Sequence, residues 1–134
     1  MIVVDTNIIC YRWMDSPHAS AADAVWQRDS HWIAPMLWRS EFRNALAGAI
    51  RQRSLTVESA LEIANLAEEG MAGNEFVVST EIVMHLVATS RCSSYDCEFV
   101  ALAQEHSLPL VTSDREILRD FGKTAISLDR FVRR

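Results

Sequence analysis

Short apolar runs alternate with longer amphipathic segments along the 134 residues of the chain. This alternation is typical of βαβ units, and it predicts an α/β fold with a mostly parallel central sheet. No repeat, low-complexity tract or linker divides the chain, so we expect a single domain over residues 1–134. The expected strands are Ile2–Val4, Trp32–Ala34, Phe76–Val78, Leu110–Val111 and Thr124–Ile126.

Seven helices are expected between and after these strands, with ends set by capping and helix-breaking residues. The last is predicted to open at Ser113, because Ser113-x-x-Glu116 fits a capping box. The third is predicted to begin near Pro35, a residue that suits a first helical turn. The third is expected to end near Arg53. The other five are expected from Thr6 or Asn7 to Met14, from His18 to about Asp29, from Thr56 to before Gly70 or Gly73, after Ser79, and from Ser93 or Ser94 to near His106.

Two carboxylates interrupt apolar helical faces. Glu41 falls within the apolar stripe of residues 38–49, and Asp96 shares one face with Phe99, Val100 and Ala103. A carboxylate in such a stripe is costly unless it is paired or bound to a cation. Ordinary explanations stay open for each, an ion pair at the stripe's edge for Glu41 and a favourable helix dipole for Asp96.

Two further acids follow short apolar strands. Asp5 comes directly after Ile2–Val4, and Asp114 comes shortly after Leu110–Val111. Each can serve simply as a helix N-cap, a position that Asp favours. In parallel α/β sheets, however, this is the carboxyl end of a strand, where ligands bind. If the two strands are neighbours, all four acids can meet at one edge of the sheet.

Four carboxylates that meet in this way need a cation, since each unpaired pair repels by about 4 kcal/mol at 4 Å and an effective dielectric near 20. Oxygen ligands without histidine fit Mg²⁺ or Mn²⁺ better than Zn²⁺. Such a carboxylate site is suited to metal-assisted phosphodiester hydrolysis, in which the metal activates water and stabilises developing charge.

The net charge of −5 argues mildly against a nucleic-acid partner, because such proteins are more often basic. Acids gathered at one metal site would account for part of the excess of negative charge. Lys123 is the only lysine among the 13 basic residues. The arginines suit bidentate phosphate contacts, although genome composition alone can produce the same bias.

No apolar run approaches the roughly 20 residues that cross a bilayer, and the N-terminus lacks the features of a signal peptide. We therefore expect a cytoplasmic protein without membrane contact. The three cysteines lack a CxxC pair and are expected to be reduced thiols. The four histidines show no metal-site spacing.

The chain carries an ordered set of short motifs: Val4-Asp5-Thr6-Asn7, Glu41 within Trp38–Phe42, Tyr95-Asp96, and Thr112-Ser113-Asp114. This set resembles the PIN-domain ribonucleases, and most of all the VapC-type toxins of bacterial toxin–antitoxin pairs. The resemblance covers essentially the whole chain. It implies a three-layer α/β/α sandwich with a central parallel sheet, RNA cleavage dependent on Mg²⁺ or Mn²⁺, a homodimer, and a cognate antitoxin protein.

The resemblance also assigns roles to individual residues. Asp5, Glu41, Asp96 and Asp114 would form the catalytic, metal-binding quartet. Thr6, Asn7 and Thr112 would orient these carboxylates by hydrogen bonds. Glu98, two residues beyond Asp96, would point away into solvent.

Several arginines lie close to the motifs in sequence and are candidates to grip RNA, chiefly Arg12, Arg43 and Arg115. Each can equally be a solvated or ion-paired surface residue. The tryptophans can stack on bases, although Trp38 lies in an apolar stripe and is expected in the core.

Two other classes of function stay open. The first is a PIN-like module that binds RNA or protein without cutting it, which the complete set of four acids disfavours. The second is an α/β phosphatase or receiver-like domain. It is disfavoured because the last third of the chain has no lysine at a strand end, since Lys123 follows Gly122 outside any expected strand end.

Overall fold

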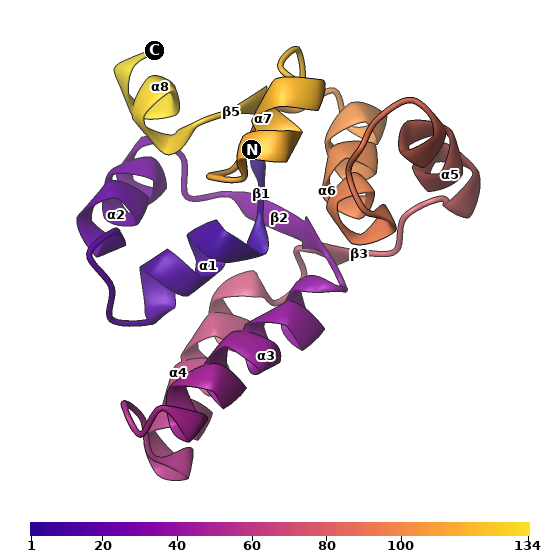
Figure 1. Cartoon of the computed structure of the whole chain (residues 1–134). Coiled ribbons are helices and arrows are strands. Elements are labelled where there is room, and N and C mark those ends of the chain that lie inside the picture. The colour runs from indigo at the N-terminus through magenta and orange to yellow at the C-terminus, as the bar shows by residue number, and fades with distance from the viewer.

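Five short parallel strands form the central sheet in the computed structural model, which describes residues 1–134 (Figure 1). The strand order is β3-β2-β1-β4-β5, and every neighbouring pair is parallel. This confirms the predicted α/β class and its parallel sheet. The strands are β1 (Ile2–Val4), β2 (Trp32–Pro35), β3 (Glu75–Phe76), β4 (Leu110–Val111) and β5 (Ala125–Ile126).

Strand β1 lies at the centre of the sheet, between β2 and β4. All three of its residues are buried, as expected for a parallel strand covered on both faces. In the pairing with β4, Val4 stands opposite Val111, and the amide of Asp5 donates to the carbonyl of Val111 at 3.1 Å. The strands that lead to Asp5 and Asp114 are therefore neighbours, which brings those acids to one edge of the sheet.

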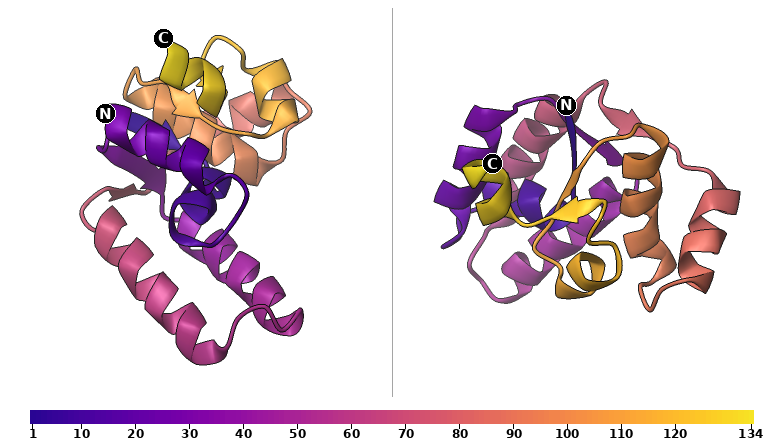
Figure 2. Two further views of the ribbon diagram at one scale, coloured as in Figure 1. Left: turned by 90° about the vertical axis from the view of Figure 1, so that its left-hand side faces the viewer. Right: turned by 90° about the horizontal axis from the view of Figure 1, so that it is seen from above.

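Eight helices flank the sheet and give the three-layer α/β/α sandwich that the family resemblance implied (Figures 1 and 2). Helix α6 packs across β1, β2 and β4, and α5 packs against α6. Helices α3 and α4 form an antiparallel pair that projects from the sheet (Figure 2). The bounds are α1 (Thr6–Trp13), α2 (Ala19–Arg28), α3 (Trp38–Arg51), α4 (Val57–Met71), α5 (Thr80–Ala88), α6 (Ser94–Glu105), α7 (Arg115–Asp120) and α8 (Leu128–Arg133).

Two helices begin later than predicted. Helix α3 begins at Trp38, because Pro35 still belongs to β2 and a turn separates the two elements. Helix α7 does not use Ser113 as its cap. Its N-cap is Asp114, whose Oδ1 accepts a hydrogen bond from the amide of Ile117 at 2.9 Å.

The prediction also placed β3 slightly too late and missed the last helix. Strand β3 covers Glu75–Phe76 instead of residues 76–78. Helix α8 is capped by Ser127, which accepts from the amide of Arg130. Only Leu128 and Phe131 of this helix are buried, so its six residues carry too little apolar periodicity to be recognised.

Three tryptophans join α1, α2 and β2 in the core. The rings of Trp13, Trp26 and Trp32 meet edge to face, with centroids 5.0 to 6.0 Å apart, an arrangement that aromatic pairs favour. Trp13 also lies directly against Gly70 of α4, where a Cβ atom would overlap the ring. None of the eight helices combines the length and the apolar character that crossing a bilayer demands.

Candidate active site

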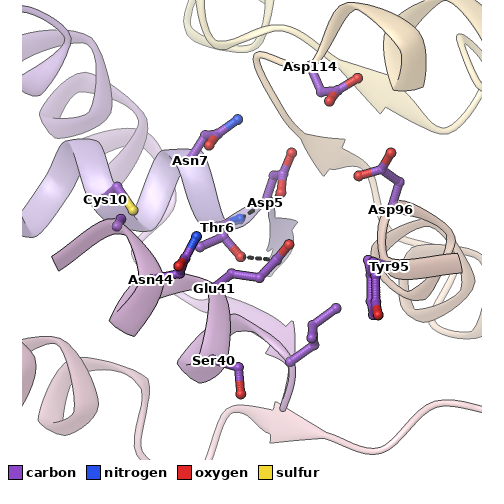
Figure 3. A pocket seen from close by; sticks show the side chains of 12 residues that line it. Asp5, Thr6, Asn7, Cys10, Ser40, Glu41, Asn44, Tyr95, Asp96 and Asp114 are labelled. Carbon is purple, nitrogen blue, oxygen red and sulfur yellow. Dashed lines mark hydrogen bonds between the residues drawn. The ribbon is translucent and has the colours of Figure 1, made fainter. Parts of the chain in front are cut away.

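A pocket of about 620 Å³ opens at the carboxyl edge of the sheet (Figure 3). All four predicted acids line it, namely Asp5, Glu41, Asp96 and Asp114. They come from four separate parts of the chain, and in Figure 3 their side chains converge on one space. The acids were expected to meet only if the strands that lead to Asp5 and Asp114 were neighbours, and these two strands do pair with each other.

Each acid stands at the N-terminal end of a helix. Asp5 and Asp114 are the N-caps of α1 and α7. Glu41 and Asp96 lie in the first turns of α3 and α6. In a parallel sheet the strands deliver helix N-termini to one edge, and the positive end of a helix dipole stabilises a nearby carboxylate by about 0.3–1 kcal/mol. The topology thus brings together four acids that the helix ends partly stabilise. None of the four forms an ion pair with a basic side chain.

Asp5 is the most enclosed of the four, with 8% of its surface exposed. Its Oδ1 accepts from the amide of Thr6 at 2.7 Å, and its Oδ2 accepts from Thr112 Oγ1 at 2.6 Å. Burial raises the pKa of this carboxyl to about 6, against the lowering effect of the two hydrogen bonds and with smaller contributions from Glu41 and Asp96. The charged form of Asp5 is therefore unfavourable without a cation nearby.

A buried threonine links two of the acids. Thr112 has no exposed surface. Its hydroxyl donates to Asp5 and accepts from the backbone amide of Asp114 at 3.0 Å. Thr6 contacts a third acid, because its Oγ1 donates to Glu41 Oε1 at 2.7 Å. Both threonines thus make the contacts that orientation of the carboxylates would require.

Asn7 lines the pocket, and its side chain makes its hydrogen bond to a serine instead of a carboxylate. Its Nδ2 donates to Ser113 Oγ at 3.5 Å, and the hydroxyl of Tyr11 lies 3.2 Å from the same Ser113 oxygen. These contacts tie α1 to the turn that precedes Asp114. Asn7 is therefore linked to the acids only through the turn that carries Asp114, whereas Thr6 bonds directly to an acid.

Burial and mutual repulsion also act on two other acids. The pKa of Glu41 is raised first by burial and then by the charge of Asp96, while the hydrogen bond from Thr6 opposes the shift. The pKa of Asp96 is raised by burial and then by Asp114. These couplings show that the carboxylates lie close enough to repel one another.

The three arginines proposed to grip RNA lie in different settings. Arg12 pairs with Asp23 at 3.2 Å, and its guanidinium lies over the rings of Trp13 and Trp26. Arg43 is 3.8 Å from a carboxylate oxygen of Glu68 on α4. Arg115, the third, is exposed. None of the twelve residues that line the pocket is basic, so the pocket itself is strongly acidic.

Glu98 does not extend into open solvent as expected. It is half-buried and lines a neighbouring groove beside α5. Burial raises the pKa of Glu98, and the charge of Glu41 adds to the effect. The prediction failed because the groove is built by β3 and α5, whose position relative to α6 is not visible in the sequence.

Three polar or aromatic side chains of the pocket were not predicted. Ser40 and Asn44 flank Glu41 on α3, and Tyr95 precedes Asp96 on α6 (Figure 3). For Asn44, the available signal was its place one helical turn after Glu41. For Tyr95, it was an aromatic residue in a first helical turn beside a candidate metal ligand.

The donor set fits a hard divalent cation. The four acids offer only oxygen atoms, the ligands that Mg²⁺ and Mn²⁺ prefer, and the raised pKa values of Asp5, Glu41 and Asp96 show negative charge in need of compensation. No group of three or more potential ligand side chains is already arranged to hold an ion. We therefore expect the carboxylates to draw together on binding.

Comparison with solved structures shows that the fold is shared with proteins of very different sequence. PAE2754 from Pyrobaculum aerophilum is 19% identical with a TM-score of 0.73, over 98% of this chain and 92% of that one. FitAcB from Neisseria gonorrhoeae is 17% identical with a TM-score of 0.74, over 96% and 98%. A toxin–antitoxin complex from Klebsiella pneumoniae contains a chain that is 16% identical with a TM-score of 0.69, over 96% and 98%.

Comparison of sequences gives a more specific result. No curated protein matches the chain. The family model of the PIN domain matches residues 2–123, a span that includes all four acids and every strand except β5. The chain therefore belongs to the PIN domain family.

Proposed function

We propose that this protein is a metal-dependent endoribonuclease that hydrolyses RNA phosphodiester bonds, and that it is the VapC-type toxin of a type II toxin–antitoxin pair. PIN domains are generally nucleases. The observation that carries the proposal is the convergence of four carboxylates from four separate elements in one pocket. A protein that only binds partners gains nothing from such a costly cluster of like charges.

Asp5, Glu41, Asp96 and Asp114 would hold Mg²⁺ or Mn²⁺. The metal would supply charge stabilisation at the scissile phosphate and a lowered pKa for the attacking water. The protein's part is orientation. Thr112 holds Asp5 and the backbone at Asp114, while Thr6 holds one oxygen of Glu41. The other oxygen of Glu41 stays free to accept a hydrogen bond from a water molecule.

RNA is the proposed substrate because the motifs resemble those of ribonucleases. Among the arginine candidates, Arg115 follows Asp114 directly at the start of α7 and is the best placed to reach a phosphate of the strand. Arg12 and Arg43 would first have to leave Asp23 and Glu68. We therefore assign them a smaller part in binding.

The proposed partners are a second copy of the chain and a cognate antitoxin. One structural neighbour comes from a toxin–antitoxin complex of Klebsiella pneumoniae, and another comes from a structure of FitAB bound to a DNA fragment. A small protein encoded next to this chain would be the first candidate antitoxin. Co-expression should yield a complex that lacks the nuclease activity of the free protein.

The test is cleavage of RNA by the purified protein. With Mg²⁺ or Mn²⁺ we expect cleavage that EDTA abolishes and that Asp5→Asn and Asp96→Asn reduce to background. Asp15→Asn is the matched control, because Asp15 is an exposed acid in the turn after α1. Full cleavage by the Asp5→Asn variant would contradict the mechanism. Binding of RNA without cleavage by the wild type would favour the non-catalytic PIN-like module instead.

A further inference from the structure

The acidic pocket raises the question of how an RNA strand is held at its reactive point. No lysine or arginine lines the pocket, and four carboxylates repel phosphates. Inside the pocket, therefore, only the proposed metal ion can attract the phosphate, and no side chain of the lining adds to that attraction. A further source of binding energy for the protein's own side chains is contact with the bases, which are uncharged and carry an aromatic face.

The tryptophans are not placed for this role. Trp32 and Trp38 are buried, while Trp13 and Trp26 pack against each other and against Arg12. Their rings are occupied by the core, and none of the four lines the pocket.

Tyr95 is different. With 60% of its surface exposed, it is the only aromatic residue among the large apolar side chains that the fold leaves exposed. It lines the same pocket as the four acids, and Figure 3 shows its ring beside Asp96 at the pocket's wall. Helix α6 otherwise buries its apolar residues, including Phe99, so an exposed ring at this point is not explained by packing.

The backbone that carries Tyr95 is well fixed. Ser93 caps α6, its Oγ accepting from the amide of Asp96 at 3.1 Å, and its carbonyl accepts from the amide of Cys97 at 3.0 Å. Tyr95 lies within this turn. The point from which its side chain extends is therefore fixed relative to Asp96, which is one of the proposed metal ligands.

We propose that Tyr95 is a stacking platform for a nucleobase that flanks the scissile phosphate. The inference rests on the proposed ribonuclease function and adds to it the contact that holds the strand at the acidic pocket. Since stacking is tolerant of sequence, the platform fixes the strand's position more than its identity. The phenol hydroxyl plays no part, because stacking uses the face of the ring.

The first test uses a single-stranded RNA that the wild type cuts in Mg²⁺. Tyr95→Ala and Tyr95→Leu should raise KM by about 5- to 150-fold, the equivalent of one lost base stack, with kcat largely retained. Tyr95→Phe should behave as the wild type. Leu61→Ala on α4 is the control, since Leu61 is 59% exposed and lies outside the pocket.

The second test locates the base. Each nucleotide near the cleavage point is replaced in turn by an abasic ribose. One position should raise KM for the wild type but cause no further loss for Tyr95→Ala, because the two changes remove the same contact. Stabilisation of Tyr95→Ala by Mg²⁺, measured by thermal unfolding, should equal that of the wild type and show that the acids are undisturbed.

The outcomes separate the two proposals. If the wild type cuts no RNA, the ribonuclease function falls and the platform falls with it. If the wild type cuts RNA and Tyr95→Ala cuts it with an unchanged KM, only the platform is overturned. A loss of kcat with unchanged KM would also overturn it, because the ring would then act through Asp96. If every abasic position raised KM by the same factor in the wild type and in Tyr95→Ala, the platform would also be overturned.

Discussion

Replacement of Asp5 by asparagine should stabilise the protein when no metal is present. Asparagine has nearly the same shape and can still accept from the amide of Thr6, so the cap of α1 survives. What disappears is a negative charge that is 8% exposed in a pocket shared with three other carboxylates. The variant therefore separates the electrostatic cost of Asp5 from its structural role.

The size of the effect follows from the pKa of Asp5. The pKa in the folded protein, about 6, lies above the ordinary value of 3.8 for an aspartate, which corresponds to roughly 3 kcal/mol at neutral pH. Loss of the hydrogen bond that Thr112 donates to the carboxylate costs about 1 kcal/mol. The net expectation is a gain of about 2 kcal/mol, or roughly 5–10 °C in Tm for a domain of this size.

The pH dependence gives the sign of the effect. Because the folded pKa of Asp5 is raised, the folded state binds more protons than the unfolded state between about pH 4 and pH 6. The metal-free wild type therefore loses stability as pH rises through this window. The gain from Asp5→Asn should be full near neutral pH and should vanish by about pH 4.

Urea unfolding in EDTA across this pH range measures the gain, with Asp15→Asn as the matched control. Addition of Mg²⁺ should reverse the order, since only the wild type would be stabilised, by about 2.7 kcal/mol at 100 times Kd. If Asp5→Asn were no more stable than the wild type in EDTA near neutral pH, or if the difference did not change with pH, the reasoning from burial would be refuted.

Two further substitutions test the orientation of Asp5 in the site and the packing of α4 against α1. Thr112→Val should lower cleavage by about 10- to 100-fold, because it removes the hydroxyl that orients Asp5, while Thr112→Ser should retain most activity; equal rates for both would exclude orientation by Thr112. Gly70→Ala should destabilise the fold by about 1–3 kcal/mol because its methyl group meets the ring of Trp13. In Gly48→Ala on α3, the added methyl group meets no neighbouring atom, so the change should raise the free energy of unfolding by about 0.5–1 kcal/mol. Chemical denaturation measures the stability of both glycine variants.

The sequence was most informative where local pattern and topology agree. The run Ile2–Val4 identified β1 and placed Asp5 at its carboxyl end, and both hold in the structure. The four acids were all named, and all four line one pocket. Their roles stay predictions, but their proximity could be anticipated only on condition that β1 and β4 were neighbours, which no local pattern determines.

Local signals failed where two elements compete for the same residues. Pro35 suits a helix start, yet its position at the end of a buried strand kept it in β2. Ser113 fitted a capping box, but the cap passed to Asp114, which is one residue closer to the helix. Such choices depend on the exact end of the preceding strand, and boundaries are the least certain part of any pattern.

Side-chain direction was equally hard to anticipate. Thr6 and Asn7 are neighbours in the first turn of α1, where successive side chains point in different directions around the helix. The threonine reaches Glu41, while the asparagine reaches Ser113. The sequence offered both as orienting residues and had no means to choose, because the choice depends on where α3 packs relative to α1.

The roles of helix cap and proposed metal ligand turn out to be compatible in this fold. Asp114 caps α7 through Oδ1, which leaves Oδ2 available to a cation. The helix ends stabilise each carboxylate by only about 0.3–1 kcal/mol, whereas two carboxylates at 4 Å repel by about 4 kcal/mol at an effective dielectric near 20. The helix ends can therefore gather the acids but cannot close them into a cage. This balance accounts for four carboxylates that share one pocket while no three of them are arranged to hold an ion.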